Sequence, residues 1–347
     1  MTATWRRAAL GLLCLSLAAA FMGVAGHASA SRAPAATAPD FAPLDQAGPR
    51  LSVPAARLAA AVTCTPNATR ARTEVALFVP ATALDPDQFS WNWFAALDKI
   101  RHPYCSVALP GHGLGDIQES AEYVVHAIRH VNRISGRKVA VVGHSQGGLE
   151  PRFALRFWPD TRGMVSDYVS LGTPNHGSLV SAANCAGGAC PPAFWQMTPQ
   201  ANFIRALNSY QETFRGISYT NVYTTLDQYV TPNRDHTGTS SLHGTDGSIT
   251  NVSLQGMCAD NTGEHIAVGT SDAVAYALAL DAITHRGPAQ PARIPPSVCA
   301  EPAMPGVDPT TYQRDLAQLN ATLTANWGAA PTATAEPALK PYVYARR

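Results

Sequence analysis

The chain has 347 residues, of which 46% are hydrophobic and 14% charged, and it contains 6 Trp and 11 Tyr. This composition is too apolar and too aromatic for a disordered protein. The 25 Lys and Arg balance the 24 Asp and Glu, so no net basic charge indicates a nucleic-acid partner.

The N-terminal region has the composition of an export signal. In residues 1–30, two arginines precede an apolar stretch that ends in small residues, as in a secretory signal peptide. Residues 31–60 are rich in Ala, Pro and Ser and are predicted to be a linker, and residues 61–347 to be one domain. No later segment has the composition expected of a transmembrane helix. We therefore expect a secreted, extracellular protein, and a monomer.

Apolar runs and amphipathic segments alternate along the predicted domain. Strands are expected at 74–79, 105–109, 138–142, 168–171, 220–224 and 251–256, and helices at 89–100, 117–134, from 147 onward, and at 309–326. Continuous apolar strands separated by helices are typical of a mainly parallel sheet that is covered on both faces. The sequence therefore predicts an α/β fold.

Six cysteines follow the predicted signal peptide. They are Cys64, Cys105, Cys185, Cys190, Cys258 and Cys299. An even number in an exported chain predicts disulfides, and zinc ligation is disfavoured because no C-x-x-C pair occurs. Short separation favours a bond between Cys185 and Cys190, and the other pairings stay open.

The strand at 138–142 runs directly into Gly143-His144-Ser145-Gln146-Gly147, and a helical pattern follows. This is G-x-S-x-G between a strand and a helix, where a sharp turn projects the serine hydroxyl and glycines avoid collisions. The N–H groups at the start of the helix can stabilise an oxyanion. The pattern predicts Ser145 as a nucleophile and the N–H of Gln146 as an oxyanion donor.

A nucleophilic serine needs a base and an acid, which follow it in the order Asp or Glu, then His, in this kind of fold. Asp227 and His265 each come just after a predicted strand, so both lie at the sheet edge that carries Ser145. Other candidates are loop residues, namely Asp235, His236, His243 and Asp260. We therefore predict Asp227 as the acid and His265 as the base.

A second oxyanion donor is expected in the loop after an early strand. Thr82, in Val79-Pro80-Ala81-Thr82, occupies that place, although an ordinary capping turn fits the sequence equally well. The glycines at 111–115 lack dinucleotide-binding spacing, and the histidine pair at 126 and 130 lacks the glutamate of a zinc motif. We expect no cofactor and no metal.

Together these features resemble the Candida antarctica lipase B-like secreted serine lipases and esterases of the α/β-hydrolase superfamily. The resemblance implies an α/β-hydrolase catalytic domain with Ser145 as nucleophile, Asp227 as acid, His265 as base, and Thr82 with Gln146 as the oxyanion hole. The similar stretches are Thr63-Cys64, Val79-Pro80-Ala81-Thr82, Trp91-Asn92-Trp93, Pro103-Tyr104-Cys105, Glu122-Tyr123-Val124-Val125, Ser145-Gln146-Gly147-Gly148-Leu149, residues 224–232, Cys258, His265, Cys299 and Glu336-Pro337.

The resemblance also implies disulfides Cys64–Cys105 and Cys258–Cys299, which leaves Cys185 with Cys190 as an addition. The chain departs from the family at Ala81, where the family has glycine. It departs again at Asn175, where the family has aspartate. Residues expected near the substrate pocket are Asn175, Trp195, Leu316, Leu319 and Leu323.

We therefore expect a hydrolase of carboxylic esters, with acylglycerols as the favoured substrates and a lipid–water interface as a further partner. An acyltransferase using the same three residues is the alternative. A peptidase and a non-catalytic binding protein on the same fold are disfavoured.

Overall fold

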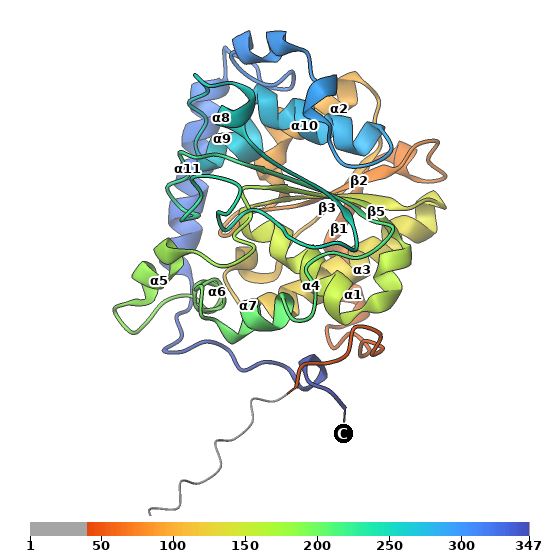
Figure 1. Ribbon diagram of the computed structural model, residues 1–347, viewed down its shortest axis with the longest axis vertical. Coiled ribbons are helices and arrows are strands. Elements are labelled where there is room, and N and C mark those ends of the chain that lie inside the picture. Colours follow the sequence, from red (N-terminus) through yellow and green to blue (C-terminus); the bar gives the residue numbers. More distant parts are fainter. Residues whose placement is uncertain (1–39, 347) are drawn as a thin grey trace, which may run out of the picture. The chain divides into compact units, whose positions relative to one another are not determined.

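A single sheet with helices on both faces forms the centre of the domain (Figure 1). The computed structural model describes residues 40–346, so the predicted signal peptide lies outside the described residues. The sheet has the order β1-β3-β2-β4-β5-β6-β7, with β1 antiparallel to β3 and every other pair parallel. The strands are β1 (Val62–Cys64), β2 (Val75–Val79), β3 (Tyr104–Val107), β4 (Val139–His144), β5 (Val165–Leu171), β6 (Ser218–Tyr223) and β7 (Ser248–Ser253). The predicted α/β fold is confirmed.

Helices cover the two faces of this sheet (Figure 1). They are α1 (Ala55–Ala60), α2 (Ala95–Lys99), α3 (Ile117–Ser135), α4 (Leu149–Phe157), α5 (Leu179–Cys185), α6 (Pro192–Gln196), α7 (Asn202–Leu207), α8 (Leu254–Met257), α9 (His265–Thr270), α10 (Ala273–Thr284) and α11 (Tyr312–Ala329). Along β2, Leu77 faces the apolar core with α3 and α4, whereas Phe78 faces the core with α10. Both faces of the strand are buried, which explains its unbroken apolar sequence.

The predicted linker is wrong from residue 40 onward. The backbone N–H of Ala42 donates to the carbonyl of Val343 at 2.8 Å, and Phe41 pairs with Tyr344, so the first and last described segments lie side by side. Leu58 of α1 is buried in the core. The Ala- and Pro-rich composition is typical of a linker, and most of these alanines and prolines are exposed, but Ala42, Val53 and Leu58 are buried against the domain.

The stretch His265–Thr284 has the length and composition of a membrane-spanning helix, contrary to the expectation from the sequence. It forms α9 and α10, and 78% of its most apolar 18-residue window is buried within the domain. The two helices are separated where the side chain of Asp272 caps α10 by accepting a hydrogen bond from the N–H of Ala275. This stretch packs as core helices against the sheet.

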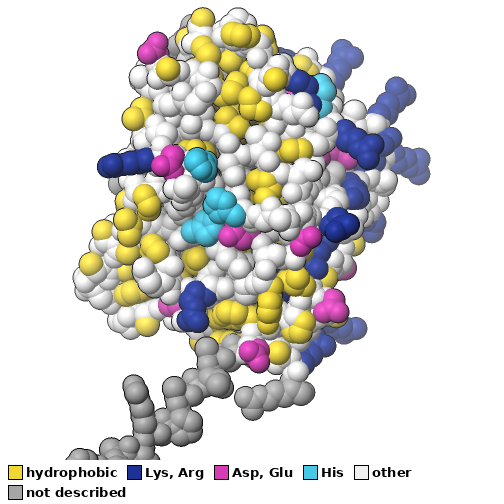
Figure 2. Space-filling view, in the orientation of Figure 1, with side chains coloured by type: hydrophobic (Ala, Val, Ile, Leu, Met, Phe, Trp, Pro, Cys, Tyr) yellow, Lys and Arg dark blue, Asp and Glu magenta, His cyan; other side chains and the backbone are white. Residues whose placement is uncertain are grey.

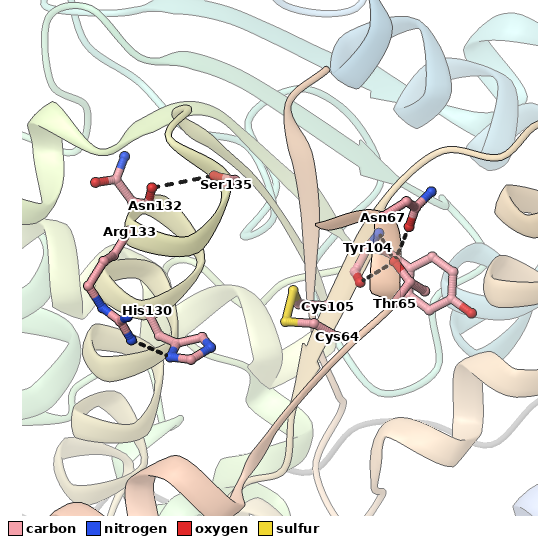
Figure 3. The surroundings of a disulfide bond; sticks show 9 residues. All are labelled: Cys64, Thr65, Asn67, Tyr104, Cys105, His130, Asn132, Arg133 and Ser135. Carbon is pink, nitrogen blue, oxygen red and sulfur yellow. Dashed lines mark hydrogen bonds between the residues drawn. A yellow bond between two sulfur atoms is a disulfide. The ribbon is translucent and has the colours of Figure 1, made fainter. Parts of the chain in front are cut away.

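Three disulfides join the predicted pairs, Cys64–Cys105, Cys185–Cys190 and Cys258–Cys299. Cys64 and Cys105 occupy opposing positions of the antiparallel pair β1–β3, and Figure 3 shows this bond beside α3. Next to it, the hydroxyl of Thr65 accepts the N–H of Tyr104 at 3.2 Å. The disulfide therefore reinforces the edge of the sheet at a point already held by the strand ladder.

Candidate active site

Ser145 stands on a sharp turn between β4 and α4. Its φ angle is +55°, and it begins a 3₁₀ turn over Ser145–Gly148. The turn requires glycine on either side of it. A Cβ at Gly143 would lie 2.2 Å from the carbonyl oxygen of Gly147, and a Cβ at Gly147 would lie 2.3 Å from that of Val79. The G-x-S-x-G sequence thus lets β2, β4 and α4 approach closely around the serine.

Ser145, His265 and Asp227 form a continuous hydrogen-bonded chain. Nε2 of His265 lies 2.9 Å from Oγ of Ser145, and Nδ1 lies 2.8 Å from Oδ2 of Asp227. The Asp227 side chain is fully buried and that of His265 nearly so. Because a carboxylate only accepts hydrogen bonds, Nδ1 carries the proton and Nε2 is free to accept the serine proton.

Backbone groups hold the acid in place. The second carboxylate oxygen of Asp227 accepts the N–H groups of Tyr229 at 2.9 Å and Val230 at 2.7 Å. Beside it, the Gln228 side chain accepts the N–H of His265 at 3.2 Å and donates to Glu264, which caps α9. The loop after β6 and the start of α9 therefore position the acid and the imidazole together.

Thr82 and Gln146 lie next to this chain. The Thr82 hydroxyl donates to the side-chain carbonyl of Gln146 at 2.6 Å, and the Gln146 amide donates to the Gly113 carbonyl at 2.7 Å and to Glu150 at 2.8 Å. Within residues 40–346, the backbone N–H groups of Thr82 and Gln146 donate no hydrogen bond. Both N–H groups are thus available to a ligand oxygen.

Glu150 is a buried carboxyl group in the first turn of α4. Burial raises the pKa of Glu150 to about 8, although the hydrogen bond from Gln146 opposes the shift. Glu150 was not among the site residues predicted from the sequence. Its signal was an acidic residue directly after the apolar start of a predicted core helix.

An apolar cleft opens beside Ser145 and His265. Phe194 of α6 and Trp327 of α11 pack together at its wall, with ring centroids 4.5 Å apart. Figure 2 shows apolar side chains scattered among uncharged ones over α5, whereas Lys and Arg gather at the upper right of this view. The cleft is lined by Ala81, Thr82, Ser145, Pro174, Ser178, Val180, Ser181, Phe194, Met197, Tyr229, Val230, His265, Ile266, Leu323 and Trp327.

Of the five predicted pocket residues, only Leu323 is among those that line this cleft. Leu316 and Leu319 instead pack in a small apolar cluster with Ala81 and Ile266, to which Leu323 of the same helix also belongs. Their prediction is wrong because the helical spacing identifies the buried face of α11 but not the part of that face that reaches the cleft, which begins at Leu323.

Asn175 and Trp195 also lie elsewhere. Asn175 is fully buried and donates to the Ser240 carbonyl at 2.8 Å, so it holds the loop after β6. The indole N–H of Trp195 donates to the Ala333 carbonyl at 2.9 Å, which ties its ring to the segment after α11. The sequence did not predict Val180 of α5, Phe194 of α6, Met197 directly after α6 or Trp327 of α11 as cleft residues.

The competing candidates do not join the site. Asp235 is exposed and accepts hydrogen bonds from the N–H and hydroxyl of Thr237, which lower its pKa. Among the hydrogen bonds of residues 40–346, none joins His265 to Asp235, His236, His243 or Asp260. The same residues contain no group of three or more His, Cys, Asp or Glu arranged to hold a metal ion.

Comparison with known proteins gives two informative relatives. No protein-family model matches the chain. Lipase B of Pseudozyma antarctica is 28% identical over 212 residues, so the chain covers 61% of that protein, and 60% of the chain is matched. The crystal structure of Aspergillus fumigatus lipase B has a TM-score of 0.78 and 26% identity, over 90% of this chain and 78% of that one. The predicted resemblance to lipase B is confirmed, and so is the α/β-hydrolase fold.

Proposed function

We propose that this chain, which has the α/β-hydrolase fold and is similar to two lipase B proteins, is an exported serine hydrolase of carboxylic esters. The observation that carries this proposal is the pair of hydrogen bonds that link Ser145 to His265 and His265 to Asp227. Ser145 and His265 also line an apolar cleft. Serine, imidazole and carboxylate in this order are the groups that acyl transfer from an ester requires.

In the proposed reaction, Oγ of Ser145 attacks the ester carbonyl carbon while its proton passes to Nε2 of His265. The carboxylate of Asp227 holds Nδ1–H and stabilises the imidazolium. The N–H groups of Thr82 and Gln146 bind the oxygen on which negative charge develops. His265 then protonates the leaving alcohol, and an acyl-enzyme remains. Water, deprotonated by His265, then attacks the acyl carbonyl. The bond from the acyl carbon to Oγ of Ser145 breaks, His265 returns the proton to Oγ, and the acid is released.

The cleft favours an ester with an apolar acyl chain. Its lining beyond Ser145 and His265 consists mainly of aliphatic and aromatic side chains, so an alkyl chain would bury apolar surface there. Leu179, which precedes the cleft residue Val180 in the sequence, is 55% exposed. Leu226, which precedes Asp227, is 50% exposed. These exposed side chains support contact with a lipid surface.

Export is supported by two independent features. The sequence of residues 1–30 has the pattern of a signal peptide, and three disulfides occur within residues 40–346. Disulfides persist in oxidising compartments and are rare in the cytosol. Secretion would be checked by expression with and without residues 1–30, followed by assay of the medium.

The test of the proposed activity is hydrolysis of p-nitrophenyl esters from acetate to palmitate, and of an emulsified triglyceride, by the parent and by Ser145→Ala. We expect activity in the parent and a loss on the order of 10⁴-fold in the variant. The acyl chain length that gives maximal activity distinguishes an esterase from a lipase. Equal ester hydrolysis by the two proteins would refute the assignment of Ser145.

A further inference from the structure

A chain of buried hydrogen bonds connects the loop before Thr82 to the backbone of His265. The N–H of Ala81 lies 2.9 Å from Oε1 of Gln88, and Nε2 of Gln88 lies 3.0 Å from Nδ1 of His144. Nε2 of His144 lies 3.1 Å from the carbonyl oxygen of His265. We call the two linking side chains the Gln88–His144 bridge.

The chemistry of the end groups fixes the direction of every hydrogen bond in the bridge. A carbonyl oxygen only accepts, so Nε2 of His144 donates to His265, and Nδ1 is left as the acceptor. The Gln88 amide N–H₂ donates to that acceptor, and its oxygen accepts the N–H of Ala81. Burial lowers the pKa of His144 to about 3, so its imidazole is neutral above that pH and keeps one tautomer.

Close packing holds the bridge rigidly. His144 is fully buried and Gln88 is 4% exposed. A Cβ at Gly269 would lie 2.1 Å from the His144 ring, so the ring sits directly against the backbone of α9. The carbonyl of Gln88 accepts the side-chain amide of Asn92 at 2.8 Å. The bridge therefore has little room to adjust to movement at either end.

Neither bridging side chain is among the residues that line the cleft, so neither is placed to touch the substrate. Resting on the proposed function, we infer that Gln88 and His144 are positioning residues, which hold the oxyanion loop and the histidine base at a fixed separation. The two parts come from opposite ends of the domain sequence, after β2 and at the start of α9. Oxyanion stabilisation depends steeply on the placement of its donors, so a bridge between donor loop and base acts on the transition state more than on substrate binding.

Four variants test the hydrogen bonds at the two ends of the bridge. Gln88→Met and His144→Phe remove both hydrogen bonds of a residue and largely keep its volume. Gln88→Glu retains the acceptor for Ala81 but loses the donor to His144. His144→Asn retains an acceptor for Gln88 but loses the donor to His265. His102→Phe is the control, since His102 is a buried histidine at the far end of the strands whose Nε2 has no partner within residues 40–346.

Gly269→Ala tests the bridge without removing any of its polar groups. The added methyl group must displace the His144 ring, because the two would otherwise lie 2.1 Å apart. The φ angle of Gly269 is not in the left-handed region, so the backbone itself accepts alanine. If the position of His144 matters, this variant loses activity as His144→Phe does.

The readouts are kcat and KM for a p-nitrophenyl ester, corrected for the fraction of Ser145 that a fluorophosphonate probe labels at completion. We expect kcat to fall about 10- to 100-fold in Gln88→Met and His144→Phe with KM changed less than about threefold. The two conservative variants should retain more activity, and His102→Phe should match the parent. Unchanged kcat per labelled site in the bridge variants would overturn the inference, because any loss would then reflect unfolded protein alone.

The rate at which the fluorophosphonate probe labels Ser145 tests the role of the bridge even if the parent protein hydrolyses no ester. If the parent hydrolyses no ester but Ser145 still reacts, slower labelling in the bridge variants supports the inference and equal labelling overturns it. If Ser145 of the parent does not react at all, both proposals fail.

Discussion

The ring of Tyr229 meets the imidazole of His265 edge-on, with centroids 5.4 Å apart and planes inclined at 64°. Tyr229 also donates its backbone N–H to Asp227 and lines the cleft. One residue thus shields the base from solvent with its side chain and fixes the acid with its main chain.

This contact predicts a role for the aromatic ring and none for the hydroxyl. Tyr229→Ala leaves the backbone hydrogen bond to Asp227 in place but opens the imidazole to water, and we expect kcat/KM to fall about tenfold. Tyr229→Phe should retain the parent rate, because it keeps the ring. The p-nitrophenyl ester assay measures both, and equal loss in the two variants would contradict the prediction.

The positive φ angle of Ser145 predicts a stability difference between two inactive variants. Alanine at this position retains the strain of a side chain in the left-handed region, whereas glycine does not. We expect Ser145→Gly to be more stable than Ser145→Ala by about 1 kcal/mol in urea unfolding. A Ser145→Gly protein less stable than the alanine variant would show that the turn is not strained.

The raised pKa of Glu150 predicts that the free energy of unfolding declines as pH rises. Its carboxyl group loses its proton near pH 4.5 in the unfolded chain and near pH 8 in the folded protein, so the folded state binds the extra proton between these values. The contribution of Glu150 to the free energy of unfolding therefore declines as pH rises from about 4.5 to about 8. Glu150→Gln removes this decline and should stabilise the protein at pH 8.5 more than at pH 4.5, as measured by urea unfolding.

The same substitution distinguishes stability from function. Glutamine at position 150 retains an oxygen that can accept the Gln146 amide, so the hydrogen bond beneath the oxyanion donor is preserved. We expect activity close to that of the parent at neutral pH. An equal change in the free energy of unfolding at both pH values would contradict the raised pKa of Glu150.

The cleft wall predicts how acyl chain length can be altered. Leu323 lines the cleft, and Trp327, one turn further along α11, packs on Phe194. Leu323→Trp should fill the cleft, lowering kcat/KM for p-nitrophenyl octanoate more than about tenfold while leaving the acetate within about threefold. Ala317→Trp, at an exposed position of the same helix outside the cleft lining, is the matched control. Equal loss on both esters would place the acyl chain elsewhere.

Much of this fold was predictable because its strongest signals are local. The apolar strands, the amphipathic α3 and the glycine turn around Ser145 each follow from a short stretch of sequence, since the backbone geometry there depends on neighbouring residues. The early segment from residue 40 was not predictable in the same way. Its packing depends on contacts with residues near 343, which no local pattern reports.

The candidate site shows the same division. Asp227 and His265 were identified because both follow strands of one sheet, whose carboxyl ends meet at a common edge. The cleft lining was largely missed, because it depends on which parts of α5, α6 and α11 meet beside Ser145. The role inferred for His144 was hidden too, since the residue before a nucleophilic serine carries no sequence signal for its hydrogen-bond partners.

The first and last described segments of the domain are paired, so residues 40 and 345 lie next to each other. The N–H of Ala345 donates to the carbonyl of Asp40 at 3.0 Å, so a short glycine-rich peptide would join the two covalently. New ends opened between Gly187 and Gly188 would lie inside the small loop that Cys185–Cys190 closes, and the disulfide would keep them together. The domain is therefore suited to circular permutation, and the Cys185–Cys190 disulfide would hold the two new chain ends together.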